Sequence, residues 1–95
     1  MAATVVVLTW DLSIPGCRSL KEKRMALRSL LDRLRNRFNL SVAETDLQDV
    51  HDRARVTAVL VTSDSRQADS LSDRIDGFVE DDGRLVIVSF RRERV

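Results

Sequence analysis

Runs of β-branched residues alternate with helical patterns along this chain, and their order is the feature that most restricts its fold. The β-branched runs are typical of strands and span residues 4–12, 40–45, 55–62 and 85–90. Two segments between them, residues 19–37 and about 64–81, carry apolar residues at the spacing of a helix. The order of the predicted elements is therefore β-α-β-β-α-β.

The predicted helices have recognisable beginnings and apolar faces. Ser19 with Glu22 forms a capping box, in which the two side chains bind free backbone N–H groups at the start of the first helix. Asp64 and its neighbours are good N-caps for the second helix, and Asp82-Gly83 predicts a turn after it. The expected inner faces comprise Leu20, Leu27, Leu31, Leu34 and Phe38 in the first helix and Ala68, Leu71, Ile75 and Phe78 in the second.

This element order predicts an α+β fold. The arrangement is the ferredoxin-like βαββαβ two-layer sandwich, a four-stranded antiparallel sheet with two helices on one face, as a single domain over residues 1–95. Right-handed crossovers place the first and third strands in the centre of the sheet. These are two of the most apolar strands, which agrees with a central position.

A two-layer fold leaves one face of the sheet uncovered. If Val6, Leu8, Trp10 and Leu12 face the helices, Val5 and Val7 face outward. In the third and fourth strands either set of alternate residues could face outward, and each choice leaves an apolar patch. Such patches usually mark interfaces, so we expect a homodimer through Val5 and Val7; a different protein partner and an unpartnered apolar surface remain alternatives.

Charge is distributed unevenly along the chain. Residues 18–37 hold eight basic residues and two acids, a net charge of +6, whereas the rest of the chain holds eight basic residues and thirteen acids, a net charge of −5. At 100° per residue, Lys21, Arg24, Arg28 and Arg35 fall within an arc of about 60° on the first helix. A positive stripe suits the phosphate backbone of a nucleic acid, but it is also compatible with an ordinary solvated helix face.

We therefore expect contacts to a nucleic acid, ribosomal RNA included, through the first helix. The candidate phosphate-binding residues are Arg18, Lys21, Lys23, Arg24, Arg28 and Arg35. Proteins that read RNA with a sheet of this kind stack bases on strand aromatics. Only Trp10 and Phe90 lie in the predicted strands, and Trp10 is expected to face the core, so we predict binding through phosphates and shape.

Other chemistry has weaker support. The loop before the first helix, residues 16–19, is a third candidate site, for a small ligand or an anion, although a capped turn explains it as well. His51 lies in an acidic loop without a metal-ligand spacing, and Cys17 has no base near it in sequence. No catalytic motif is present, so we expect a protein without enzymatic activity, metal or cofactor. The single cysteine and the lack of a signal or membrane segment predict a cytoplasmic location.

Several stretches together resemble one known family. They are the residues I-P-G-C-R-S-L-K-E-K-R from position 14, R-L-R-N-R-F-N from position 33 and S-V-A-E from position 41. On these residues the chain is similar to the YlxP-like family, small bacterial proteins of unknown function. The resemblance implies a ferredoxin-like fold. It also implies a ribosome-linked role, because genes of the family often lie beside those of a translation initiation factor and a ribosome-binding factor. It implies no reaction and no catalytic residue.

Overall fold

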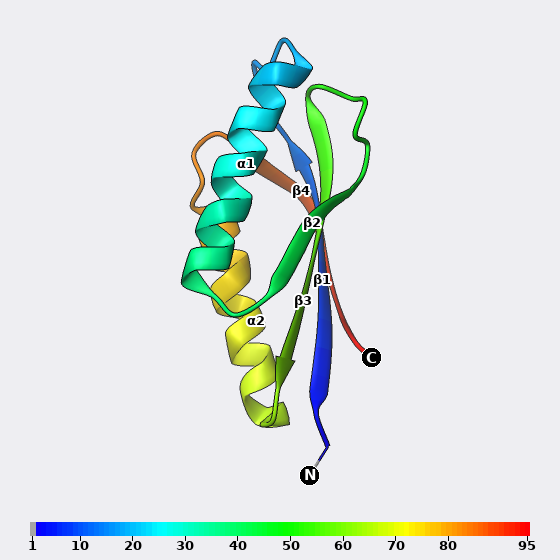
Figure 1. Ribbon diagram of the computed structural model, residues 1–95, viewed down its shortest axis with the longest axis vertical. Coiled ribbons are helices and arrows are strands. Elements are labelled where there is room, and N and C mark those ends of the chain that lie inside the picture. The colour runs from blue at the N-terminus through cyan, green and yellow to red at the C-terminus, as the bar shows by residue number, and fades with distance from the viewer. Residues whose placement is uncertain (1) are drawn as a thin grey trace.

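The computed structural model describes residues 2–95, and its elements follow the predicted order. The strands are β1 (Thr4–Ser13), β2 (Ser41–Asp46), β3 (Arg53–Thr62) and β4 (Val86–Arg94), and the helices are α1 (Leu20–Arg37) and α2 (Ser65–Glu80). The strands form one antiparallel sheet in the order β2-β3-β1-β4, with β1 and β3 in the centre. Both helices pack on the same face of the sheet (Figure 1). The predicted ferredoxin-like α+β fold is confirmed.

The core lies between the sheet and the helices. Val6, Leu8, Trp10 and Leu12 are almost completely buried, so β1 points this face toward the helices as its alternation predicts. Trp10 stacks on Phe90 of β4 with ring centroids 5.3 Å apart, and its indole N–H donates to Asp76 of α2 at 2.9 Å. The Trp10 side chain thus connects β1 to both β4 and α2.

The strand β4 extends further than its composition suggests. β4 continues through four charged residues to Arg94, because Arg91–Arg94 pair with the N-terminal half of β1. On the face of β4 toward the helices, Arg92 and Arg94 reach over the sheet edge to bind Asp73 and Asp69 of α2 at 2.9 and 3.3 Å. These ion pairs hold a polar strand end against a helix where apolar side chains would otherwise be expected.

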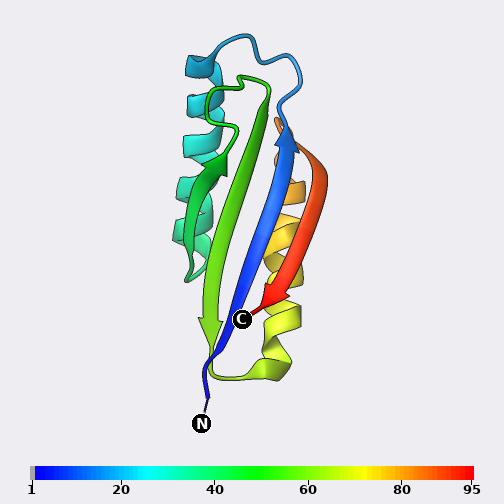
Figure 2. The ribbon, with the colours of Figure 1, turned by 90° about the vertical axis from the view of Figure 1, so that its right-hand side faces the viewer.

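The opposite face of the sheet carries no helix (Figure 2). A register shift between Asp11 and Leu12 in the pairing of β1 with β4 places Ile87 and Phe90 on the covered side, while Val86 and Val88 are more than half exposed. In β3 the covered residues are Val56, Ala58 and Leu60, so Val59 and Val61 lie on the open side. The structure thereby resolves the orientation of the third and fourth strands, which their sequences left open.

Candidate nucleic-acid interface

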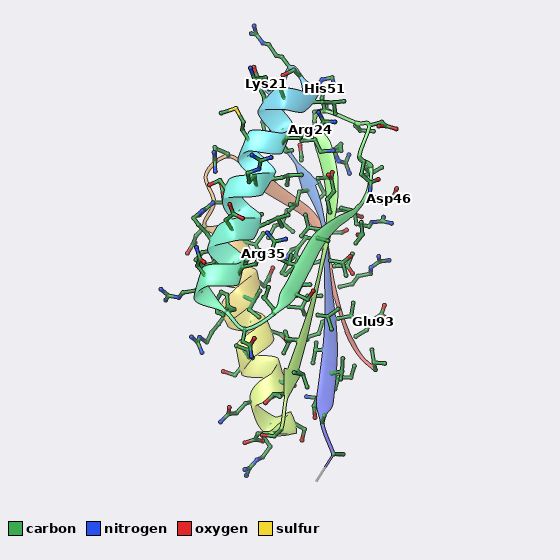
Figure 3. All side chains as sticks on the ribbon, viewed as in Figure 1. Lys21, Arg24, Arg35, Asp46, His51 and Glu93 are labelled. Carbon is green, nitrogen blue, oxygen red and sulfur yellow. The ribbon has the colours of Figure 1, made fainter. Side chains whose placement is uncertain are left out.

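The outer face of α1 carries three cationic side chains that we call the basic ridge: Lys21, Arg24 and Arg28. All three are exposed, and none takes part in an ion pair within residues 2–95. Their spacing of three and four residues places them on one side of α1 over about 10 Å of helix length. Figure 3 shows Lys21 and Arg24 near the N-terminal end of the helix, and Arg35 further along it.

The ridge differs from the other arginines of the molecule. Most of those lie within 4 Å of a carboxylate; they are Arg33, Arg35, Arg55, Arg66, Arg84, Arg92 and Arg94. Their charge is partly neutralised by a neighbouring acid, whereas the charge of the basic ridge is not. The positive potential of α1 is therefore concentrated in its N-terminal half.

Two further predicted contacts, Arg35 and Arg18, lie near the ridge. Arg35 donates to the backbone oxygen of Val42 at 2.9 Å and lies 3.4 Å from Asp32, with about half of its side chain exposed. Arg35 therefore connects α1 to β2, and only part of its hydrogen-bonding capacity remains for a phosphate. Arg18 is exposed in the loop before α1, where its backbone N–H donates to Glu22 at 3.0 Å. Its side chain extends the cationic surface beyond the helix.

Shallow grooves flank the basic ridge on both sides. Toward β2, a groove of about 340 Å³ is lined by Arg24, Arg28 and Arg35 together with Glu44. On the other side, a groove of about 740 Å³ is lined by Lys21, Arg24, Arg28 and Asp32 around Met25, which is 65% exposed. Arg24, Arg28 and Asp32 line both grooves, so the crest between the two concave surfaces carries two arginines and one acid.

Lys23 does not belong to this surface, and its prediction as a phosphate contact is wrong. Only 1% of the side chain is exposed, and its ammonium donates to the backbone oxygens of Leu47 and Val50 at 2.7 and 2.6 Å. The same nitrogen forms an ion pair with Oε2 of Glu44 at 2.7 Å. All of the binding capacity of the ammonium is used inside the protein, so none is left for a phosphate.

The spacing of residues in α1 carries a signal for this burial that our sequence analysis did not use. Lys23 precedes Leu27, Leu30 and Leu34 at intervals of four, three and four residues, which is the spacing of the buried face. Glu44 alternates with buried Val42 in β2 and so points to the same side of the sheet. A lysine and a glutamate, each in phase with a buried face, indicate an internal ion pair.

The open sheet face has an apolar half near the chain ends. Val5 and Val7, the predicted interface residues, lie there next to Val59 and Val61 of β3. Val59 is 39% exposed and Val61 56% exposed. The four side chains form one patch across the two central strands, because Val5 pairs with Val61 and Val7 pairs with Val59.

In the other half of the open face the central strands are polar, although Val86 and Val88 of β4 are exposed beside them. Arg55 binds Asp11 through two hydrogen bonds of 2.7 and 3.2 Å, and it lies 3.4 Å from Asp46. Ser89 donates to the same Asp11 carboxylate at 3.1 Å. The guanidinium of Arg55 holds the pKa of Asp11 below its usual value, against the opposing effect of partial burial. Asp11 in turn raises the pKa of Arg55.

The remaining candidate positions lie apart from these surfaces. In the loop before α1, the helix N-terminus is capped by the chain itself, since Glu22 donates its N–H to Ser19 at 3.1 Å. The Cys17 thiol lies 3.3 Å from the backbone oxygen of Ser19. His51 is exposed in the β2–β3 loop. Within residues 2–95, no helix combines the length and apolar character needed to span a bilayer.

Comparison with known proteins assigns the chain to a family. The family model described as "Protein of unknown function (DUF503)" matches residues 5–92. The chain belongs to the DUF503 family. One relative, the uncharacterised protein YlxP of Bacillus subtilis, is 36% identical over 62 residues, which are 65% of this chain and 67% of that protein. The resemblance found in the sequence is confirmed, and the function of the family is not established.

One solved structure similar to this DUF503 chain has the same fold, and a second is a weaker match. A dimeric ferredoxin-like protein from an uncultured marine organism matches with a TM-score of 0.50 and 12% identity over 99% of this chain and 86% of that chain. The C-terminal domain LarC2 of a cyclometallase involved in synthesis of the NPN cofactor of lactate racemase matches with a TM-score of 0.47 and 11% identity. That match covers 99% of this chain, which spans 56% of LarC2.

Proposed function

We propose that this DUF503 protein is a non-enzymatic, cytoplasmic accessory factor that binds RNA phosphates, on the ribosome or on free ribosomal RNA, through the basic ridge. The observation that supports it is the contrast in pairing: Lys21, Arg24 and Arg28 are exposed and have no carboxylate within 4 Å, while most other arginines have one. Phosphate contacts from unneutralised cations release condensed counterions, which favours binding.

The shape of the surface favours contact with the RNA backbone over contact with bases. Arg24 and Arg28 stand between two grooves, so successive phosphates can lie on both sides of the same crest. The covered position of Trp10 leaves no aromatic platform in the centre of the sheet on which bases could stack. Binding of this kind depends on charge and shape and has little sequence preference. The ribosome-linked role implied by the family resemblance agrees with such a partner.

A matched pair of charge reversals tests the proposal. The test variant carries Lys21→Glu, Arg24→Glu and Arg28→Glu, and the control carries Arg53→Glu, Arg66→Glu and Arg91→Glu, which change the net charge equally at exposed positions away from α1. We expect the test variant to lose RNA affinity by at least about a hundredfold at low salt, because three phosphate contacts disappear and three repulsions replace them. Fluorescence anisotropy with a labelled ribosomal RNA fragment measures this.

The control determines how the result is interpreted. If both variants lose affinity equally, the contact depends on net charge and not on the ridge. If neither loses affinity, the ridge does not bind RNA. Circular dichroism of both variants checks that the helices remain intact.

A second function is favoured by a separate observation, the exposed valines of the open sheet face. We propose that this face is a protein interface through which the chain forms a homodimer. The similar ferredoxin-like protein from an uncultured marine organism is described as dimeric, which agrees with this proposal. In a protein with no role in nucleic-acid binding, this interface alone would be the functional surface.

Charged residues in the valine patch test the dimer. Because Val5 and Val7 point away from the core, we expect a Val5→Lys, Val7→Lys variant to remain folded and to sediment as a monomer at concentrations at which the unchanged protein is a dimer. Analytical ultracentrifugation measures the association. A folded variant that still sediments as a dimer would place the interface on another surface.

A further inference from the structure

The two central strands carry matched pairs of residues on the open face. β1 and β3 are in register along ten residues, and the outward-facing partners are Val5 with Val61, Val7 with Val59, Thr9 with Thr57, Asp11 with Arg55 and, at the strand ends, Ser13 with Arg53. The first four pairs join the same or complementary chemistry: valine beside valine, threonine beside threonine, and an acid beside a base. The outward-facing residues of β1 and of β3 therefore form two complementary columns that a second copy of the same face could match.

A two-fold axis that lies parallel to the strands, in front of the space between β1 and β3, would exchange these columns. It places β1 of one subunit opposite β3 of the other without changing the height along the strand. Val5 then faces Val61 of the partner subunit, and Asp11 faces Arg55 of the partner subunit. We propose that the open face binds a second copy of this chain in this arrangement, an inference that rests on the sheet-face dimer proposed above.

The outer strands fit the same operation. It brings β2 opposite β4 of the partner subunit, so Ser41 faces the partner's Glu93 and Ala43 faces the partner's Arg91, as the registers of β2 and β4 prescribe. No like charges oppose each other in these rows. Stacked sheets rotate by about 30° relative to each other, which displaces outer strands more than central ones, so the central rows decide specificity.

Another axis is less compatible with the surface. An axis in the interface but perpendicular to the strands turns one sheet end for end. Centred on the sheet, it would place the apolar half over the polar half of the partner, so that valines would cover Asp11 and Arg55 and deprive them of water. Only the axis parallel to the strands lets the whole face overlap with apolar on apolar and acid on base.

The size of the face sets the expected strength of the dimer. Two strands of ten residues, one of nine and one of six cover roughly 570 Å² per subunit at the usual rise and spacing of strands. This is somewhat below the 800 Å² or so that each partner buries in a standard interface. We therefore expect a reversible dimer with a dissociation constant on the order of micromolar.

Pairing between two opposite charge variants tests the axis directly. Asp11→Arg gives the central polar row two positive charges, and Arg55→Asp gives it two negative charges. Each variant alone should associate at least about tenfold more weakly than the unchanged protein, because like charges face each other across the axis. An equal mixture of the two should form heterodimers near the original strength, because opposite charges now face each other. Sedimentation of one fluorescently labelled variant with and without the other measures this.

A control pair carries the same types of change away from the face. Asp69→Arg and Arg94→Asp alter an ion pair between α2 and β4, and each should dimerise like the unchanged protein. Circular dichroism confirms that all four variants are folded. A folded Val59→Lys variant, changed at a partly exposed position, should be monomeric in every mixture.

The possible results separate this arrangement from the proposals on which it depends. Restored association only in the Asp11→Arg and Arg55→Asp mixture supports the axis parallel to the strands. A dimer that Val59→Lys disrupts, but that mixing does not restore, overturns this axis and leaves the sheet-face interface. A protein that stays monomeric at millimolar concentration overturns both, while RNA binding by the basic ridge is unaffected because the ridge lies on the helix side.

Discussion

Lys23 has a different role from the cationic residues around it in α1. Lys21 and Arg24 are exposed, whereas Lys23 turns inward and binds two backbone oxygens and the Glu44 carboxylate. The backbone oxygens belong to the β2–β3 loop, where Leu47 adopts a left-handed conformation with φ of 63°. Lys23 compensates for this uncommon conformation by fixing the loop against the helix.

Replacing Lys23 should therefore affect stability strongly. Lys23→Met removes the ammonium, so the carboxylate of Glu44 and the backbone oxygen of Val50 lose this donor, while the oxygen of Leu47 keeps only the N–H of Val50. We expect a loss of about 3 to 5 kcal/mol in the free energy of unfolding, as for other broken buried ion pairs. Lys21→Met, two residues earlier and exposed, should change it by no more than about 0.5 kcal/mol. Urea denaturation measures both. Equal effects of the two substitutions would contradict the assigned role of Lys23.

Single residues mark the limit of what could be predicted here from sequence. The alternation of β1 correctly placed Trp10 in the core and Val7 on the open face, because a strand has only two sides. On a helix, side chains point in many directions around the axis. A long side chain near the edge of the buried face can therefore turn toward solvent or toward the core. For that reason composition alone assigned Lys23 to the surface, although its spacing from Leu27 placed it on the buried side.

At the scale of elements, α1 is held at each end by a different device. Ser19 caps its first turn as predicted, since it accepts the N–H of Glu22 at 3.1 Å, whereas the Glu22 side chain reaches back to the N–H of Arg18 at 3.0 Å, one residue before the N-cap. Toward its other end, Arg33 binds Asp82 in the turn between α2 and β4. Asp82 is buried and also accepts the N–H of Arg84 at 2.9 Å. This contact fixes the α2–β4 turn against α1 over 49 residues of sequence separation.

The contact of Asp82 should make stability depend on pH. Burial by itself raises the pKa of Asp82, but the bonds from Arg84 and Arg33 outweigh it and hold the pKa below its usual value. The carboxylate therefore stabilises the fold above about pH 4, and this contribution is lost as the pH falls through the lowered pKa of the folded state.

Asp82→Asn is the variant that tests this dependence. It should lower the free energy of unfolding by about 1 to 2 kcal/mol at pH 7, because a hydrogen bond to a charged group is lost. The difference should shrink as the pH falls through the lowered pKa of Asp82, because the carboxyl of the unchanged protein then becomes protonated as well. Asp81→Asn, at the exposed neighbouring residue, is the control. In thermal denaturation, a difference for Asp82→Asn that follows the same pH course as that for Asp81→Asn would contradict this assignment.

The elements themselves were predictable because their signals are local. The capping box, the Asp82-Gly83 turn and the β-branched runs all depend on residues close in sequence. The extension of β4 to Arg94 was not predictable in this way, because ion pairs with Asp69 and Asp73 on a different element stabilise it. Long-range partners of charged residues leave no local pattern.

At the scale of the whole molecule, two candidate surfaces lie on opposite sides. The basic ridge lies on the helix layer, and the valine patch lies on the uncovered side of the sheet (Figures 1 and 2). In the proposed dimer the sheets pack together and the helix layers remain outside, so both ridges stay accessible. Binding of RNA and self-association are therefore expected to be independent of each other, and one dimer has two separate RNA sites.

The concentration of positive charge in α1 could be predicted from the sequence. Which of these cationic side chains remain free to bind a phosphate could not. Eight basic residues in residues 18–37 indicated a cationic helix. The folded structure removes Lys23 by burial, and it commits Arg33 and Arg35 to Asp82 and to Val42 with Asp32. What remains is Arg37 at the C-terminal end of α1 and a surface in its N-terminal half, centred on Arg24 and Arg28.

The most direct test of the central proposal is the salt dependence of binding to ribosomal RNA and to 30S particles. Three phosphate contacts predict that the logarithm of the binding constant falls with the logarithm of salt concentration with a slope of about −2 to −3. The variant Lys21→Glu, Arg24→Glu, Arg28→Glu should bring that slope close to zero. Binding that does not weaken with salt, or a slope that the variant leaves unchanged, would contradict RNA recognition by the basic ridge.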